Sequence, residues 1–132
     1  MEIVSLEIAK KLKEKGFDEV CYDYYEPLKH CLNQIKTPWT NKEGESYGVI
    51  TAPTISQVLK WLREEKKISI EVGIHCSLKW MCGIYGFSDG LSDFTQYSNS
   101  YDCVDDTVYI LYDSYELAAI AGIEYVIDND LI

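Results

Sequence analysis

No run of this sequence approaches the roughly 18 consecutive apolar residues that a helix needs to cross a bilayer. The first residues, Met-Glu-Ile-Val-Ser-Leu-Glu, also lack the basic start and apolar core of a signal peptide. These two absences predict a cytoplasmic protein without membrane attachment. The length of 132 residues fits the usual size of one domain, so we expect a single domain over 1–132.

The sequence also lacks the motifs of the common enzyme classes. It has no phosphate-binding glycine loop, no Gly-x-Ser-x-Gly elbow and no His-Glu-x-x-His zinc motif. Only two histidines are present, which leaves little capacity for general-base catalysis. We therefore expect no enzymatic activity, no catalytic residues and no cofactor.

The cysteine count is odd, since five cysteines cannot all pair within one chain. Cys21, Cys76 and Cys82 lie in apolar, strand-like runs, where a free cysteine behaves as a small hydrophobic residue. The alternative is a zinc site that combines the His-Cys dipeptides at 30–31 and 75–76. Successive side chains of a strand point to opposite faces, and the spacing matches no zinc frame. The sequence therefore predicts free thiols in a reducing compartment, and no metal.

Lysine and arginine are absent from residues 80–132, which we call the acidic part. Residues 1–79 contain all twelve Lys and Arg and also twelve acids, so their net charge is zero. The acidic part contains ten acids and therefore carries the whole net charge of −10. This balance excludes extensive phosphate contacts, so we expect no direct binding of nucleic acid.

The acidic part is also rich in tyrosine, with seven of the 11 in the chain. Tyrosine is favoured at interfaces because it offers a large contact area at little cost in rotamer entropy. Acids and tyrosines crowd residues 88–106, which we predict as a partner-binding loop with these site residues: Asp89, Asp93, Tyr97, Tyr101, Asp102, Asp105 and Asp106. The simpler alternative is an acidic surface that only keeps the protein soluble.

Three segments have the apolar periodicity and end signals of helices: 5–15, 55–65 and 114–127. Ser5 and Gly16 are suited to cap the two ends of the first. Capping boxes open the other two, with Thr54 and Gln57 before the second, and Asp113 and Glu116 before the third.

Alternating or β-rich segments predict strands over 20–25, 68–74, 78–87 and 107–112, with 68–74 and 78–87 as an antiparallel hairpin. Residues 27–51 are predicted to be irregular, with a short helix over 28–35 or a functional role as alternatives. The fold class is α+β: one small antiparallel sheet of three to four strands, with about three helices packed on it.

Three phrases carry a resemblance: Ser5 to Phe17, Ala52-Pro-Thr-Ile-Ser-Gln-Val-Leu-Lys-Trp-Leu-Arg-Glu64, and Asp113 to Glu116. They resemble small, mostly uncharacterised accessory proteins of phages and prophages of Bacteroides-like bacteria. The second phrase is the most specific, and 88–106 departs from the group's pattern. The resemblance implies an accessory role in a bacterial host cell and brings no catalytic residues with it.

Together these features favour a small acidic phage protein that inhibits a host nucleic-acid-binding defence protein, as anti-CRISPR proteins do. Its partner would be basic, such as a CRISPR effector, whose channels for guide and target are positively charged. One alternative is a structural or accessory phage protein without inhibitory role. A weaker alternative is a metal-dependent enzyme that uses Asp102, Asp105 and Asp106. A carbohydrate or small-ligand pocket would instead use the three tryptophans, Trp39, Trp61 and Trp80.

Overall fold

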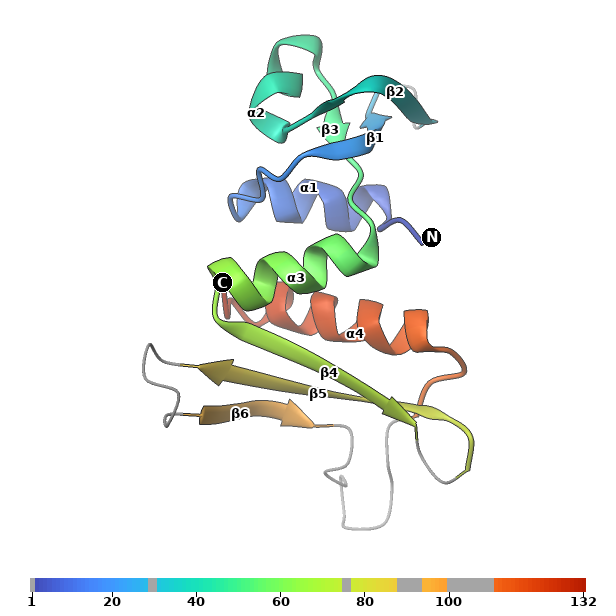
Figure 1. The fold of residues 1–132 in the computed structure, drawn as a ribbon, viewed down its shortest axis with the longest axis vertical. Coiled ribbons are helices and arrows are strands. Elements are labelled where there is room, and N and C mark those ends of the chain that lie inside the picture. Colours follow the sequence, from blue (N-terminus) through green and yellow to red (C-terminus); the bar gives the residue numbers. More distant parts are fainter. Residues whose placement is uncertain (1, 29–30, 75–76, 88–93, 100–110) are drawn as a thin grey trace. The chain divides into compact units, whose positions relative to one another are not determined.

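The computed structural model describes residues 2–28, 31–74, 77–87, 94–99 and 111–132. These residues form an α+β fold with antiparallel sheets, so the predicted fold class is confirmed (Figure 1). The chain divides into two compact units, the N-terminal unit Met1–Val58 and the C-terminal unit Leu59–Ile132. The single domain predicted over 1–132 stays a prediction.

The N-terminal unit begins with helix α1, Leu6–Glu14. Ser5 caps its start, because its side-chain oxygen accepts a hydrogen bond from the backbone N–H three residues on, at 3.4 Å. Gly16 ends it with a φ of 91°, and the Phe17 N–H then donates to a helix carbonyl at 2.9 Å. The helix predicted over 5–15 is confirmed together with both of its caps.

The first sheet has strand β1, Cys21–Glu26, in its middle. Strands β2, Cys31–Trp39, and β3, Ile50–Thr51, pair with it on either side, both antiparallel. The strand predicted over 20–25 is therefore confirmed. The prediction of one sheet is wrong, since the C-terminal unit has a second sheet of its own.

The prediction that 27–51 is irregular, or holds a helix over 28–35, is wrong. Residues 31–39 form β2, whose backbone groups find their partners on β1 rather than within a helix. A short helix, α2 (Asn41–Gly44), and a 3₁₀ turn, η1 (Glu45–Tyr47), then lead the chain to β3.

Helix α3, Ile55–Glu65, has the predicted bounds and the predicted capping box. The Gln57 N–H donates to the Thr54 hydroxyl at 3.2 Å, and the Thr54 N–H donates to the Gln57 side chain at 3.0 Å. These two hydrogen bonds supply acceptors for two backbone N–H groups at the helix start that have no partner within the helix. The helix begins in the N-terminal unit and continues into the C-terminal unit.

The second sheet has the order β4, β5, β6, with bounds Ile68–Ile74, Trp80–Phe87 and Phe94–Asn99. Strands β4 and β5 form the predicted antiparallel hairpin, with seven residue pairs in register. Strand β6 corrects the prediction that all of 88–106 is loop, because pairing with β5 supplies its backbone partners. Of the strand predicted over 107–112, residues 107–110 lie outside the described residues, and Tyr112 forms only an isolated bridge.

Helix α4, Tyr115–Asp128, confirms the helix predicted over 114–127 and packs against β4 and β5. Its cap is Ser114, whose hydroxyl accepts from a backbone N–H at 3.1 Å, and not Asp113 as predicted. Asp113 pairs with a lysine instead, which removes it from the capping role.

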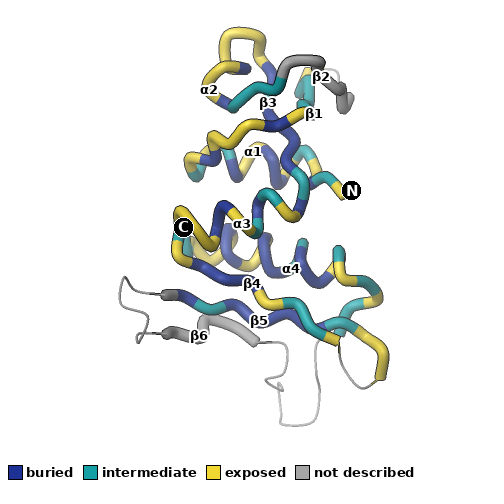
Figure 2. The backbone as a smooth tube through the Cα atoms, in the orientation of Figure 1, coloured by how far each residue is buried: buried dark blue, intermediate teal, exposed yellow. Residues whose placement is uncertain are grey.

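Gly122 lets helix α4 approach the sheet closely. An added Cβ there would lie 2.6 Å from the Ile70 side chain and 2.8 Å from the Cys82 sulfur. The close packing of this helix on the sheet therefore requires a residue without a side chain at this position. Figure 2 shows the buried stretches of α1, α4 and the strands that form the cores of the two units.

Among the described residues, no helix combines the length and apolar character that crossing a membrane requires.

Candidate functional site

Most of the predicted partner-binding loop lies beyond the part of the chain that the structure describes. This applies to six of the seven predicted site residues: Asp89, Asp93, Tyr101, Asp102, Asp105 and Asp106. Tyr97 lies on β6. Its neighbours Ser98 and Gln96 pair with Ile84 and Tyr85, which are consecutive on β5, so Tyr97 has no residue opposite it. Tyr97 is therefore the extra residue of a β-bulge, a feature that is over-represented at functional sites.

Within the described acidic part, helix α4 exposes an acidic stripe made of Leu117, Glu124, Tyr125 and Asp128. These positions fall on one side of the helix, because spacings of seven and eleven residues return to the same face at 3.6 residues per turn. Leu117 is 51% exposed and Tyr125 is 37% exposed. The stripe thus combines carboxylates with an aromatic and an aliphatic side chain, and helix α4 contains no basic residue.

The charges at the end of α4 are opposite to what helix stability favours. The carbonyl end of a helix carries a partial negative charge, so cations stabilise it and anions destabilise it. The last turn of α4 nevertheless has no basic residue, Asp128 is the final residue of the helix, and Asp130 follows the C-cap. Departures from such local stability rules are expected at sites of function.

The Asp113 side chain, in the described acidic part, forms an ion pair with Lys79. The hydrogen bond and the charge of that lysine lower the pKa of the Asp113 carboxyl. Because both side chains are largely exposed, the pair adds little stability. Lys79 is also the last basic residue of the chain.

The three tryptophans pack with different partners. Trp61 is a core residue with 5% of its surface exposed, and Lys66 lies over its ring at 5.3 Å. Trp80 is half-buried and meets the Tyr115 ring edge-on, with centroids 5.7 Å apart. None of the three tryptophans lines the hollow that is described below.

Trp39 belongs to an aromatic cluster with Tyr24 and Tyr47 in the N-terminal unit. The rings of Trp39 and Tyr47 stack, with centroids 4.9 Å apart and planes at 10°. The Tyr24 ring is tilted by 39° against Trp39 at 5.7 Å. The tertiary fold brings Tyr24 of β1 to the other two rings.

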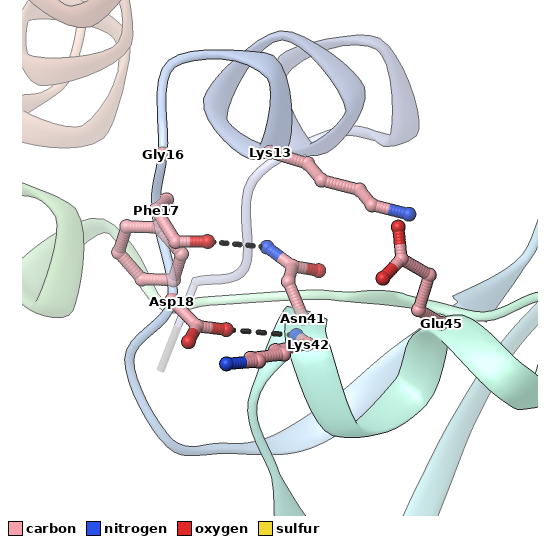
Figure 3. A pocket seen from close by; sticks show the side chains of 7 residues that line it. All are labelled: Lys13, Gly16, Phe17, Asp18, Asn41, Lys42 and Glu45. Carbon is pink, nitrogen blue, oxygen red and sulfur yellow. Dashed lines mark hydrogen bonds between the residues drawn. The ribbon is translucent and has the colours of Figure 1, made fainter.

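A hollow of about 190 Å³ opens beside the end of α1 (Figure 3) and is lined by Lys13, Gly16, Phe17, Asp18, Asn41, Lys42 and Glu45. The buried Asn41 amide donates to the Phe17 carbonyl at 2.7 Å and accepts from the Thr51 N–H at 2.9 Å. The Lys42 N–H donates to the Asp18 carboxylate at 2.8 Å. These bonds tie α2 to the chain after α1 and to β3, so the Asn41 side chain serves the fold.

Cys21 and Cys82 are buried free thiols, as predicted. Burial raises the pKa of each from 9.0 to about 11, so neither is a nucleophile at neutral pH. In the described ranges, no three His, Cys, Asp or Glu side chains come together in an arrangement that would hold a metal ion.

Comparison of the chain with protein-family models, curated proteins and solved structures found no match. The resemblance to phage accessory proteins therefore stays a prediction, and the functional inference depends on the residues themselves.

Proposed function

We propose that this protein acts by binding rather than by catalysis. Its acidic part docks on the basic surface of a nucleic-acid-binding protein of a bacterial host and blocks that surface, in the manner of an anti-CRISPR inhibitor. The observation that carries the proposal is the α4 acidic stripe, where carboxylates lie at the end of the helix that disfavours them.

Charged groups and apolar contact area contribute to binding in different ways. Exposed carboxylates speed association with a basic surface, but salt screens them over a Debye length of about 8 Å at physiological ionic strength. Contacts of tyrosine and leucine side chains are much less sensitive to salt. The stripe supplies both kinds of group through Glu124, Asp128, Tyr125 and Leu117, and 88–106 adds further acids and tyrosines.

The proposal is tested by capture followed by competition. The full chain is immobilised, exposed to lysate of a Bacteroides-type bacterium at low salt, and washed at rising salt. Each retained protein is then purified and its binding to nucleic acid is measured with and without the chain. We expect at least one retained protein that binds nucleic acid and loses that binding when the chain is added.

Two results would contradict the proposal. If no protein is retained at any salt, the acidic surface only provides solubility, as the structural alternative holds. If retained proteins keep their nucleic acid when the chain is bound, the chain does not block the basic surface.

A further inference from the structure

The aromatic cluster of Tyr24, Trp39 and Tyr47 is held in place although Tyr47 is 69% exposed. Tyr47 ends the 3₁₀ turn, and Gly48 follows it with a φ of 67° and an N–H that donates to the Glu45 carbonyl at 3.2 Å. A left-handed residue at this position fixes the direction of the turn. A preformed aromatic surface loses little conformational entropy on binding, which makes it suited to recognition.

The cluster lies on the face of the first sheet that points away from the body of the N-terminal unit. The Tyr25 hydroxyl donates to the Val4 carbonyl at 2.6 Å, and Val4 is fully buried. Successive side chains of a strand point to opposite faces, so Tyr24 lies on the other face. Glu26, two residues further, shares that face with Tyr24.

The surroundings of the cluster are acidic. Apart from Asp23, which shares the opposite face with Tyr25, the described residues of β1 and 38–48 have one basic side chain, Lys42, against three carboxylates: Glu26, Glu43 and Glu45. Figure 3 shows Glu45 directed toward Lys13. The Glu43 carboxylate is next to the cluster, because it accepts the N–H of Thr40, the residue after Trp39, at 3.2 Å.

We propose that the aromatic cluster binds an arginine side chain of a protein partner. A guanidinium group is flat and weakly hydrated, so it stacks on an aromatic ring while its N–H groups pair with carboxylates at the ring edge. The Tyr47 ring has one face on Trp39 and the exposed remainder available for stacking. A phosphate group would be repelled by the same carboxylates, and a neutral sugar would gain nothing from their charge.

This surface is formed by residues outside the acidic part, so the proposal does not depend on the proposed function. The test uses the full chain and two synthetic peptides, four Arg-Gly repeats and four Lys-Gly repeats. Binding is followed at the backbone amide NMR signals of residues 39–48, which separates it from attraction to the acidic part. We expect the arginine peptide to bind about fivefold more tightly than the lysine peptide at these signals.

Matched variants then assign the contact to the cluster. Tyr47→Ser should weaken binding of the arginine peptide about fivefold. Tyr22→Ser removes a tyrosine of similar exposure, 63%, outside the cluster and should leave binding unchanged. Glu43→Gln keeps the capping box, which glutamine also supports, and should weaken arginine binding by removing the charge.

Three outcomes would overturn the proposal. The first is equal affinity for the arginine and lysine peptides, which would indicate charge attraction alone. The second is an equal loss in Tyr22→Ser and Tyr47→Ser. The third is tighter binding of cellohexaose than of the arginine peptide at the same signals, which would make the cluster a sugar-binding surface.

Discussion

The two units have similar architecture but different charge. Each contains a three-stranded antiparallel sheet with a helix against it. Residues 1–58 contain seven basic and nine acidic residues, a net charge of −2, whereas residues 59–132 contain five basic and thirteen acidic residues, a net charge of −8. Since the same kind of sheet forms in both, the excess of acid in the C-terminal unit is not needed for folding. This difference is the reason for the proposal that the acidic surface serves binding.

The units also differ in what holds their elements together. The N-terminal unit depends on a buried polar side chain, Asn41, that joins three segments by hydrogen bonds. The C-terminal unit depends on close apolar packing of α4 on the sheet at Gly122. Substitutions at these two positions should therefore destabilise different units for different reasons.

The largest effect is expected for Asn41→Ala. Asn41 is 4% exposed, so the variant leaves the Phe17 carbonyl and the Thr51 N–H buried without a partner. We expect the free energy of unfolding to fall by about 3 kcal/mol, measured by urea denaturation. The control is Asn129→Ala, whose side-chain bond is exposed, with a change of about 0.5 kcal/mol or less. Equal effects of the two variants would show that the buried amide is not important.

A smaller loss, of about 2 kcal/mol, is expected for Gly122→Val, because its side chain would overlap Ile70 and Cys82. Ala121→Val places the same side chain on the half-exposed side of the same helix, where only the helix propensity changes, by about 0.5 kcal/mol. Urea denaturation compares the two. If Gly122→Val is no less stable than Ala121→Val, the close approach of helix and sheet is wrong.

Among the described residues, each unit has a buried thiol, so both should respond to alkaline pH. The pKa of Cys21 and of Cys82 is about 11 in the folded protein, against 9.0 for an unburied thiol. Between pH 9 and pH 11 the folded state therefore keeps protons that the unfolded state has lost, and stability falls as the pH rises. We expect a fall on the order of 1 kcal/mol for each thiol across this window, measured by urea denaturation. The fall should be smaller in Cys82→Ala, and an equal fall in that variant would contradict burial of this thiol.

The smallest effect has the opposite sign. The double variant Glu124→Lys with Asp128→Lys should stabilise the protein by about 0.5 kcal/mol, because cations are favoured at the end of α4. Glu116→Lys, in the first turn of the same helix, should destabilise it by a similar amount of about 0.5 kcal/mol. Thermal denaturation at low salt measures both, and the double variant should also retain less host protein. Destabilisation by the double variant would show that the acids of the stripe serve the fold.

The sequence predicts the elements whose signals lie within their own residues. The helices at 5–15, 55–65 and 114–127 carry their own periodicity and caps, and the β4–β5 hairpin carries its alternation, so all four are confirmed. Strands β2 and β6 were missed because their backbone partners lie on β1 and β5, which the local pattern does not show. Because the sequence does not predict β2 and β6, it also does not show that the strands form two separate sheets.

The candidate sites also differ in how much of each can be predicted from the sequence. The charge count alone indicates the acidic part, and helical spacing places Glu124 and Asp128 together on α4. The aromatic cluster required the fold, since Tyr24 meets Trp39 only after β1 and β2 have paired. Of the seven predicted site residues, only Tyr97 lies in the described part of the chain, on a strand that the sequence does not predict.

The central claim, that the acidic part binds the partner through its position and not only through net charge, is tested most directly by two triple variants. One reverses Asp102, Asp105 and Asp106 to lysine, and the other reverses Glu14, Glu64 and Glu65, which are exposed residues outside the acidic part. Both change the net charge equally. Affinity for a captured host protein, measured by calorimetry at physiological salt, should fall at least tenfold in the first variant and remain within about twofold in the second. Equal affinities of the two variants would contradict the claim.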